Sequence, residues 1–299
     1  MGPLRTLLAG PVPAVLDGAL ATELEAGGHD LRDSLWSARL LADDPAAIAA
    51  VHRSYRAAGA QVLTSASYQA SAEGFGARGI SPDAAEALLQ RSVELARAAA
   101  GGALVAASCG PFGALLAGGQ EYTGDYADAS EDAVEAFHER RLRVLLAARP
   151  DCVACETIPR ASEAGALCRV LDRLGAPEAW ISFSCRDGRT TNHGEPIEEA
   201  VAAAGASARV VAVGVNCTAP EHVGELLARA RTATDLPLVA YPNSGRTWNA
   251  AARRWSAGGA ATLPAATVQA WAGAGARLIG GCCGLGPAAV RAIAAALRS

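Results

Sequence analysis

The sequence predicts an α/β protein built as a (β/α)8 TIM barrel. Eight short apolar segments alternate with Ala- and Leu-rich segments of helical periodicity along the 299 residues. Strands that are apolar throughout are typical of parallel sheets covered on both faces, and eight strand–helix units can close into a barrel. Because no linker or change of composition divides the chain, we expect residues 1–299 to form a single barrel domain.

Each expected strand is a short apolar run that ends in polar or glycine residues. The expected strands cover residues 14–18, 61–67, 103–110, 152–157, 179–185, 210–217, 236–243 and 277–283. An open doubly wound sheet is the alternative arrangement of such units. Its glycine-rich phosphate-binding motif is missing after the first run, where the chain reads LDGALATELE. The pattern therefore favours the barrel.

Helical periodicity predicts the elements that connect these strands. The clearest helical segments are 45–59, 81–100, 131–148, 220–231 and 286–299. A proline near the start of a helix is typical, because the first N–H groups of a helix have no partner within it. Pro45, Pro82, Pro220 and Pro287 occupy such positions.

The charge and composition exclude several classes of function. A net charge of −4, with 51% hydrophobic and 19% charged residues, offers no basic surface for nucleic acid or an anionic membrane. The first apolar segment is interrupted by Pro11 and Pro13, so we expect neither a signal peptide nor a membrane span, and a cytoplasmic location. All 26 basic residues are Arg, which excludes Schiff-base chemistry and a P-loop lysine.

Polar side chains gather at the carboxyl ends of the expected strands. They are Asp17, Ser65, Ser67, Ser108, Glu156, Ser184, Asn216, Cys217, Asn243, Cys282 and Cys283. In a barrel these ends form one face, on which the βα-loops build active sites. We therefore expect these side chains to converge on a ligand.

The cysteines at this face indicate a metal site. Cys217 ends the sixth expected strand and the pair Cys282 and Cys283 ends the eighth. Strands of equal parity contribute to the same interior layers, and the glycines around the pair allow the chain to bend so that both sulfurs reach one point. Three thiolates suit Zn²⁺ and leave one tetrahedral position for a substrate. Such a position suits a substrate thiol, whose pKa of about 8.5 otherwise leaves little thiolate at neutral pH.

The motifs along the chain resemble those of the zinc-dependent homocysteine S-methyltransferases that use S-methylmethionine or S-adenosylmethionine as the methyl donor. In order, they are LDGALATELE, LWSARLL, TSASYQAS, GPFGALLAGGQEYTGDY, CETIP, WISFSCRDG, GVNCTAP, YPNSG and GARLIGGCCG. GVNC and GGCC are the most specific and supply the three cysteines. The chain departs from the family pattern at Gly284–Gly286 and at 189–196, and neither departure touches a cysteine of these motifs.

The resemblance implies a set of roles. The zinc ligands are Cys217, Cys282 and Cys283, and the residues near homocysteine are Asp17, Ser67, Tyr68, Gln69, Glu156 and Asn243. It implies that the two acidic residues hold the amino-acid end of homocysteine and that its carboxylate is received by the loop around Tyr68. A zinc-bound thiolate would then attack the methyl group of a sulfonium donor to give methionine. The aromatic candidates for the donor site are Trp36, Tyr68, Tyr122 and Tyr126. The expected partners are these small molecules, and the expected state is a monomer or homodimer.

Two other functions stay open at this point. A thiol redox protein would use Cys282 and Cys283 as a vicinal pair, and a non-enzymatic zinc-binding barrel would close the fourth metal position. For the remaining cysteines we expect core packing. These are Cys109, Cys152, Cys155, Cys168 and Cys185. Of the five histidines, we expect only His193 as a candidate for the donor site, and solvated or capping roles for His29, His52, His138 and His222.

Overall fold

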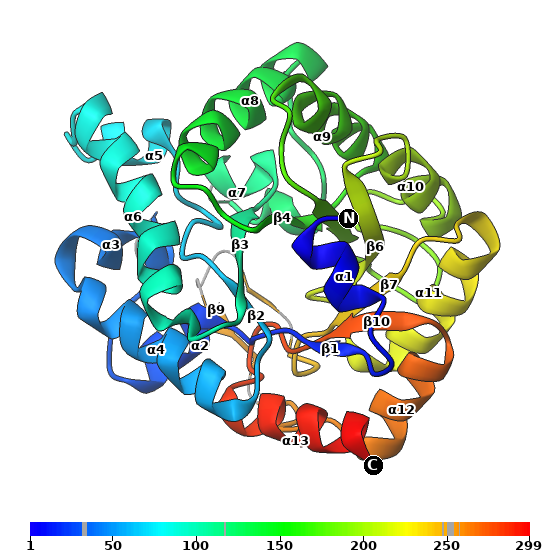
Figure 1. Ribbon diagram of the computed structural model, residues 1–299. Coiled ribbons are helices and arrows are strands. Elements are labelled where there is room, and N and C mark those ends of the chain that lie inside the picture. Colours follow the sequence, from blue (N-terminus) through cyan, green and yellow to red (C-terminus); the bar gives the residue numbers. More distant parts are fainter. Residues whose placement is uncertain (32–34, 117, 247, 250–253, 257) are drawn as a thin grey trace.

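The eight expected strands form one parallel sheet that closes into a barrel. The computed structural model describes residues 1–31, 35–116, 118–246, 248–249, 254–256 and 258–299. The strand order is β1-β10-β7-β6-β5-β4-β3-β2. The two ends of this order meet, because Leu16 bridges Val62 in parallel and the Asp17 N–H donates to the Val62 carbonyl at 3.1 Å. The predicted barrel is therefore confirmed (Figure 1).

All of these strands except β4 are shorter than the apolar runs that predicted them. They are β1 (Ala14–Val15), β2 (Val62–Thr64), β3 (Leu104–Cys109), β4 (Cys152–Ile158), β5 (Ala179–Phe183), β6 (Val210–Asn216), β7 (Leu238–Tyr241) and β10 (Ala276–Ile279). A separate antiparallel pair joins β8 (Trp248–Asn249) to β9 (Arg254–Trp255). Most of the difference lies at the carboxyl ends, where the chain leaves the sheet to form the loops of the functional face.

Helices surround the barrel, and one crosses its amino-terminal end (Figure 1). The longer ones are α4 (Pro45–Ala58), α6 (Pro82–Ala100), α8 (Glu131–Ala147), α9 (Ala161–Arg173), α10 (Ile197–Ala204), α11 (Pro220–Ala233), α12 (Ala265–Gly273) and α13 (Pro287–Arg298). The shorter ones are α1 (Pro3–Leu8), α2 (Leu20–Ala26), η1 (Trp36–Arg39), α3 (Leu40–Asp43), α5 (Ala72–Gly76), α7 (Phe112–Leu116) and η2 (Gln120–Tyr122). The five predicted helices correspond to α4, α6, α8, α11 and α13.

The barrel interior changes from apolar to polar along its axis. At the amino-terminal end, Leu4 and Leu8 of α1 are buried in a cluster with Trp180 and other inward-facing side chains. Farther along, the Tyr241 hydroxyl lies 2.6 Å from the Ser182 hydroxyl and accepts from the Trp180 indole N–H at 3.1 Å. Polar groups inside a core need such hydrogen-bond partners. Because α1 covers the apolar amino-terminal end, the polar carboxyl-terminal end is the one that remains open to a ligand.

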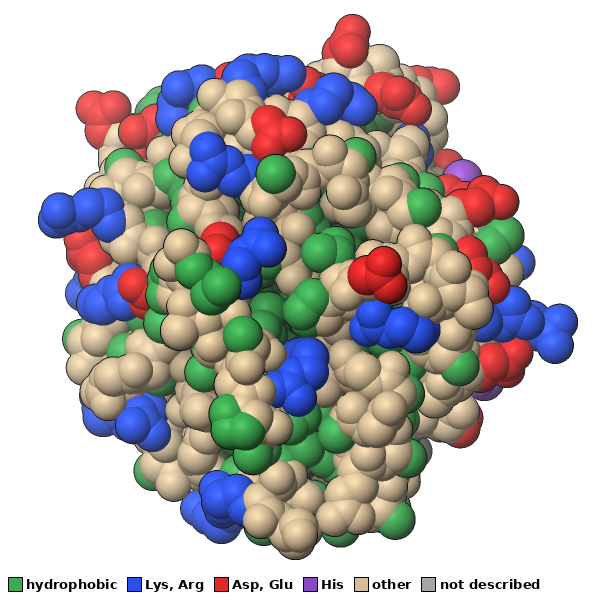
Figure 2. All heavy atoms as spheres, turned by 45° about the vertical axis from the view of Figure 1, so that its right-hand side comes forward, with side chains coloured by type: hydrophobic (Ala, Val, Ile, Leu, Met, Phe, Trp, Pro, Cys, Tyr) green, Lys and Arg blue, Asp and Glu red, His purple; other side chains and the backbone are tan. Residues whose placement is uncertain are grey.

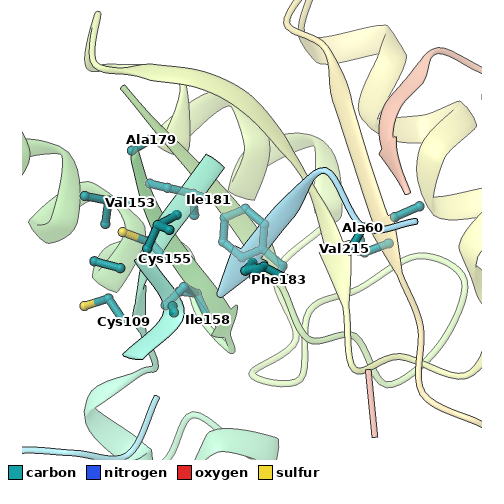
Figure 3. Packing of buried hydrophobic residues seen from close by; sticks show 14 of the residues in the cluster. Ala60, Cys109, Val153, Cys155, Ile158, Ala179, Ile181, Phe183 and Val215 are labelled. Atoms are coloured by element: carbon teal, nitrogen blue, oxygen red, sulfur yellow. The ribbon is translucent and has the colours of Figure 1, made fainter. Parts of the chain in front are cut away.

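A second core layer lies between the sheet and the helices. Figure 3 shows part of it, with Cys109, Val153 and Cys155 among the apolar side chains of neighbouring strands. Cys109 and Cys155 are partners in the register of β3 and β4. All five cysteines for which we expected packing are buried free thiols, although the Cys109 sulfur also contacts polar side chains.

The predicted surface roles of two histidines are wrong. His52 on α4 and His138 on α8 are buried, with exposed fractions of 1% and 0%. Both occupy positions of the buried helix stripe, with His52 beside Val51 and Tyr55, and His138 beside Phe137. The apolar residues of a buried helix face recur at i, i+3, i+4 and i+7, and both histidines fall on that face. This periodicity is the sequence signal that could have identified them as buried.

The surface has no single-sign charged patch on the face shown in Figure 2, where acidic and basic side chains are interspersed. Within the described ranges, no helix combines the length and the apolar character needed to cross a bilayer.

Candidate metal and substrate site

Three cysteine sulfurs meet at the carboxyl end of the barrel, and we call them the rim cluster: Cys217, Cys282 and Cys283. The Sγ atoms of Cys217 and Cys283 are 3.8 Å apart, and those of Cys282 and Cys283 are 4.0 Å apart. All three lie within 4.8 Å of one another. This spacing is what three sulfur ligands around one metal ion would have, since a zinc–sulfur bond is about 2.3 Å long. The donor set therefore fits a thiophilic metal ion.

Backbone hydrogen bonds hold the cysteine pair in its bend after β10. The Gly280 N–H donates to the Ala240 carbonyl at 3.1 Å, and the Cys282 N–H donates to the Pro242 carbonyl at 2.7 Å. Gly284 has a φ of +83°, a left-handed conformation that glycine adopts without strain. The expected bend out of the sheet is therefore present, and both sulfurs of the pair reach the same point.

Cys217 itself has a strained backbone. Its φ is +47°, which is uncommon for a residue with a side chain. The Asn243 side-chain amide donates to the Cys217 carbonyl at 3.1 Å, and the Cys217 N–H donates to the Tyr241 carbonyl at 3.1 Å. Asn243, which the resemblance placed among the residues near homocysteine, is thus bonded to the main chain of Cys217. These bonds hold the Cys217 sulfur toward the other two.

A second strained residue is bonded to Asn216, the neighbour of Cys217 in the chain. Thr157, at the end of β4, has a φ of +61°, and the register between β4 and β5 shifts between Cys155 and Ile158. The Asn216 side chain holds it, accepting from the Thr157 N–H at 2.7 Å and donating to its hydroxyl at 2.8 Å. An irregularity of this kind re-aims side chains at a strand end, and here Glu156 faces the interior.

The three thiols share their protons. Hydrogen bonds from Cys282 and Cys283, and then from Tyr122, lower the pKa of Cys217 well below its ordinary value. The Tyr122 hydroxyl lies 3.4 Å from the Cys217 sulfur. The same hydrogen bond to Cys217 raises the pKa of the Cys282 and Cys283 thiols. One negative charge is thus favoured in the rim cluster, and full deprotonation calls for a cation.

The two acidic residues of the resemblance lie beside the rim cluster. Burial raises the pKa of Asp17 well above its ordinary range, although the Thr64 N–H donates to its carboxylate at 2.8 Å. Burial raises the pKa of Glu156 to about 7, although the Ser108 hydroxyl donates to it. The charge of Glu156 also raises the pKa of Asp17, and a cationic ligand between the two carboxyl groups would favour the ionised form of both.

The loop after β2 has its side chains engaged within the protein. The Ser67 hydroxyl donates to the Ser108 carbonyl at 2.7 Å, and the Gln69 amide donates to the Ala114 carbonyl at 3.0 Å. The Tyr68 carbonyl accepts from the Gly110 N–H at 3.2 Å. These bonds shape the loop at the barrel mouth and direct the Ser67 and Gln69 side chains to carbonyls of the protein.

Behind this loop lies a buried polar group that the sequence did not lead us to expect. We call it the wall cluster: Cys109, Tyr126, His138, Arg141 and Glu163. The Arg141 guanidinium donates to the Cys109 sulfur at 2.9 Å and to the Tyr68 carbonyl at 3.2 Å. His138 lies 3.6 Å from that sulfur through Nδ1 and 2.7 Å from Glu163 through Nε2.

Glu163 connects the wall cluster to the loop that carries Tyr122. Its carboxylate accepts from the Phe112 N–H at 2.6 Å and from the Tyr126 hydroxyl. Both ends of the segment 112–126 are thus attached to one buried side chain. Tyr126 therefore belongs to the wall, not to a donor pocket as we expected from its residue type.

The other donor-site candidates differ in position. Tyr122 and Tyr68 lie at the mouth, where the charge of Cys217 raises the pKa of both phenols in addition to burial. His193 is exposed, lies 3.0 Å from the Glu195 carboxylate through Nδ1, and borders Gly124 of the segment that carries Tyr122. The side chain of Trp36 lies outside the described part of the chain.

Comparison with known proteins gives one consistent result. The family model described as homocysteine S-methyltransferase matches residues 14–297. The chain is 47% identical to homocysteine S-methyltransferase 4 of Zea mays, over 95% of this chain and 89% of the other. It is 45% identical to homocysteine S-methyltransferase of Escherichia coli, over 98% of both chains. The metallated form of the homocysteine methyltransferase MmuM from Escherichia coli superposes with a TM-score of 0.88, at 44% identity and over 100% of both chains.

Proposed function

The chain belongs to the homocysteine S-methyltransferase family, and from this premise we propose that its rim cluster binds one zinc ion at which homocysteine is methylated by a sulfonium. The observation that carries this proposal is the meeting of three sulfurs from two distant segments within 4.8 Å. We propose residues 1–299 as one homocysteine-binding barrel, acting in the cytoplasm as a monomer or homodimer on small molecules alone.

The chemistry of the donor set fits the metal and the task. Bound by three thiolates, zinc would keep one coordination position for the homocysteine sulfur and lower the pKa of that thiol so that it binds as a thiolate. Cys282 is the most accessible of the three, while Cys217 and Cys283 are buried. We place the entry of homocysteine on the side of Cys282.

The acidic pair orients the amino acid. Asp17 and Glu156 are buried carboxyl groups at the mouth, and an ammonium group between them would favour their ionised forms. The charge of Cys282 acts on Glu156, so this carboxyl lies on the same side as the proposed entry. Holding the ammonium there fixes the distance and direction of the sulfur, which is the main contribution that positioning makes to such a reaction.

The reaction is an in-line displacement. The homocysteine sulfur forms a bond to the methyl carbon, and the bond from that carbon to the sulfonium sulfur breaks with its electron pair, which leaves a neutral thioether. The products from S-methylmethionine are then two molecules of methionine. No proton is transferred in this step once the thiol is ionised.

The two alternative functions lose their support. A vicinal redox pair would not need Cys217, whose strained backbone is held toward the other sulfurs. A closed zinc site would need a fourth protein ligand, and among the described residues the three cysteines are the group close enough to hold one ion. The family relatives favour the methyltransferase over both.

An assay with three donors tests the proposal. Zinc-loaded protein is incubated with homocysteine and S-methylmethionine, S-adenosylmethionine or betaine, and methionine is measured. We expect methionine from a sulfonium donor, and Cys217→Ala to lose bound zinc and at least about a thousandfold of turnover. Cys168→Ala is the matched control, because that thiol is buried against the Ala204 carbonyl at 3.1 Å. Full turnover by Cys217→Ala would reject the ligand assignment.

A further inference from the structure

A carboxylate at the barrel mouth has an oxygen without a partner. Glu121 belongs to η2, and its Oε2 is buried and accepts no hydrogen bond from the described residues. Burial raises its pKa to about 7. A buried polar atom without a partner costs free energy, so its presence in a native structure calls for an explanation.

The surroundings of Glu121 place it on the Cys217 side of the rim cluster. Its neighbour in the chain, Tyr122, has its hydroxyl 3.4 Å from the Cys217 sulfur. Its own carbonyl accepts from the Ser184 hydroxyl at 3.2 Å, which attaches η2 to the end of β5. The charge of Glu121 also acts on the phenols of Tyr68 and Tyr122. One carboxylate and two tyrosine rings thus line one side of the mouth.

Two other carboxylates of the mouth, those of Asp17 and Glu156, lie toward Cys282 and are already engaged. Asp17 accepts from the Thr64 N–H and hydroxyl, and Glu156 accepts from the Ser108 hydroxyl. The rim cluster therefore has a pair of acidic residues near Cys282 and Glu121 near Cys217. With S-methylmethionine the proposed reaction receives three cationic groups, which are the ammonium of homocysteine and the ammonium and sulfonium of the donor. In an in-line displacement the methyl carbon lies between the attacking sulfur and the sulfonium sulfur, so the sulfonium needs a site apart from the acidic pair that holds the homocysteine ammonium.

We propose that Glu121 is a specificity-determining residue that binds the sulfonium of the methyl donor, with Tyr68 and Tyr122 facing the same cation. This inference rests on the proposed function. A carboxylate attracts a cation in a partly dry cleft, and tyrosine faces add a cation–π contribution.

The charge change during the reaction gives the proposal a kinetic signature. The donor is a cation before methyl transfer and a neutral thioether after it, so its attraction to Glu121 falls as the reaction proceeds. An interaction that is stronger with the bound substrate than in the transition state lowers KM without raising kcat. Glu121 should therefore act on the KM of the donor, and its loss of attraction for the product should favour release.

Glu121→Gln tests this in the zinc-loaded enzyme. We expect the KM of S-methylmethionine to rise about tenfold, with kcat unchanged or higher and with the KM of homocysteine and the zinc content unchanged. By calorimetry, the preference of the wild-type protein for S-methylmethionine over methionine, whose thioether sulfur is neutral, should fall in the variant by a similar factor. Glu121→Asp should recover part of the donor affinity, since it keeps the charge.

Asp128→Asn is the matched control, because Asp128 is an exposed carboxylate of the same loop. We expect its donor KM to equal that of the wild type. An unchanged donor KM in Glu121→Gln, or a fall in kcat alone, overturns the inference while the proposed function stands. Absence of methionine from any sulfonium with the wild-type enzyme would instead reject the proposed function itself.

Discussion

The rim cluster and the wall cluster are two groups of cysteine sulfur and polar side chains in different parts of the same barrel. In the rim cluster three sulfurs contact one another, the Tyr122 hydroxyl and the Asn216 amide. In the wall cluster one sulfur, that of Cys109, contacts the Arg141 guanidinium and His138. The first group lies at the mouth of the barrel, and the second is enclosed between the sheet and α8 and α9.

The two clusters differ in where the positive charge beside their sulfur atoms comes from. Burial would raise the pKa of Cys109, but the Cys155 thiol, Arg141 and His138 lower it well below its ordinary value. The chain thus supplies its own cation to the wall cluster. None of the groups that contact the rim sulfurs, among the residues that the structure describes, is cationic. Proximity of cysteines alone therefore does not indicate a metal site; the rim cluster indicates one because its charge has no compensation within the protein.

Removing the wall cation should have the largest effect on stability. Arg141→Met removes the guanidinium donor from the Gly110 carbonyl and the Cys109 sulfur, and one of two donors from the Tyr68 carbonyl. We expect the free energy of unfolding to fall by about 3 kcal/mol, measured by urea denaturation. We expect the zinc content of the folded variant to stay at that of the wild type, because no rim sulfur contacts this side chain.

The control for this variant is on the same helix. Arg143 is exposed and pairs with Glu139 one helical turn away, at 2.6 Å. Arg143→Met should cost less than about 1 kcal/mol, as exposed ion pairs do. Equal losses in the two variants, or loss of zinc on removing Arg141, would contradict the separation of wall from rim.

His52 sharpens the comparison, because it is a buried polar residue without the partners of the wall cluster. Neither of its ring nitrogens has a hydrogen-bond partner in the described residues, and burial lowers its pKa from 6.5 to about 4. A group whose folded pKa is depressed destabilises the fold as pH falls from the unfolded pKa to the folded one. Between pH 7 and pH 5 this should remove about 2 kcal/mol of stability.

His52→Leu should abolish most of that pH dependence, which urea denaturation at several pH values would measure.

His138 differs, because hydrogen bonds to Cys109 and Glu163 raise its pKa against the effect of burial. The stability that protonated His138 contributes is therefore fully present below the pKa of histidine in the unfolded chain, and it is lost as pH rises through the higher pKa of His138 in the folded protein. His222→Leu, at a half-exposed position of α11, is the control that should keep the wild-type slope. The same acid sensitivity in His52→Leu as in wild type would refute this assignment.

The barrel and the rim cluster could be predicted because each produces a local pattern in the sequence. The wall cluster produces no such pattern. Continuous apolar strands and the glycines around Cys282 and Cys283 are local patterns. Cys217 could be placed beside that pair because the sixth and eighth strands contribute side chains to the same layers of the barrel interior. His138 and Arg141 lie in a helix whose polar residues suggested solvent. Their spacing from Val134, Phe137 and Leu142 follows the buried stripe, so periodicity could have marked them as buried. Their partner Glu163 comes from another helix, and no local pattern relates α8 to α9.

Glu121 shows a second limit of sequence reasoning. The segment GGQEYTGDY offered two tyrosines as donor-site candidates, and the structure assigns Tyr126 to the wall and Tyr122 to the mouth. Nothing in residue type distinguishes Glu121 from the exposed acidic residues that follow it. Only the three-dimensional position of η2, attached through Ser184, shows which carboxylate lacks a partner.

The smallest expected effect comes from Cys155, the register partner of Cys109 (Figure 3). Cys155→Ala removes a buried sulfur from apolar packing and should lower the free energy of unfolding by about 1 kcal/mol. Zinc content and both KM values should be unchanged, because β4 directs Cys155 outward to the wall and Glu156 inward to the mouth.

Cys283→Ala, which also removes one buried sulfur, should lose the metal. Metal analysis of these two variants separates packing from ligation, since they delete the same atom type and differ only in which face of the barrel it occupies. Loss of zinc from Cys155→Ala would show that the wall supports the metal site after all.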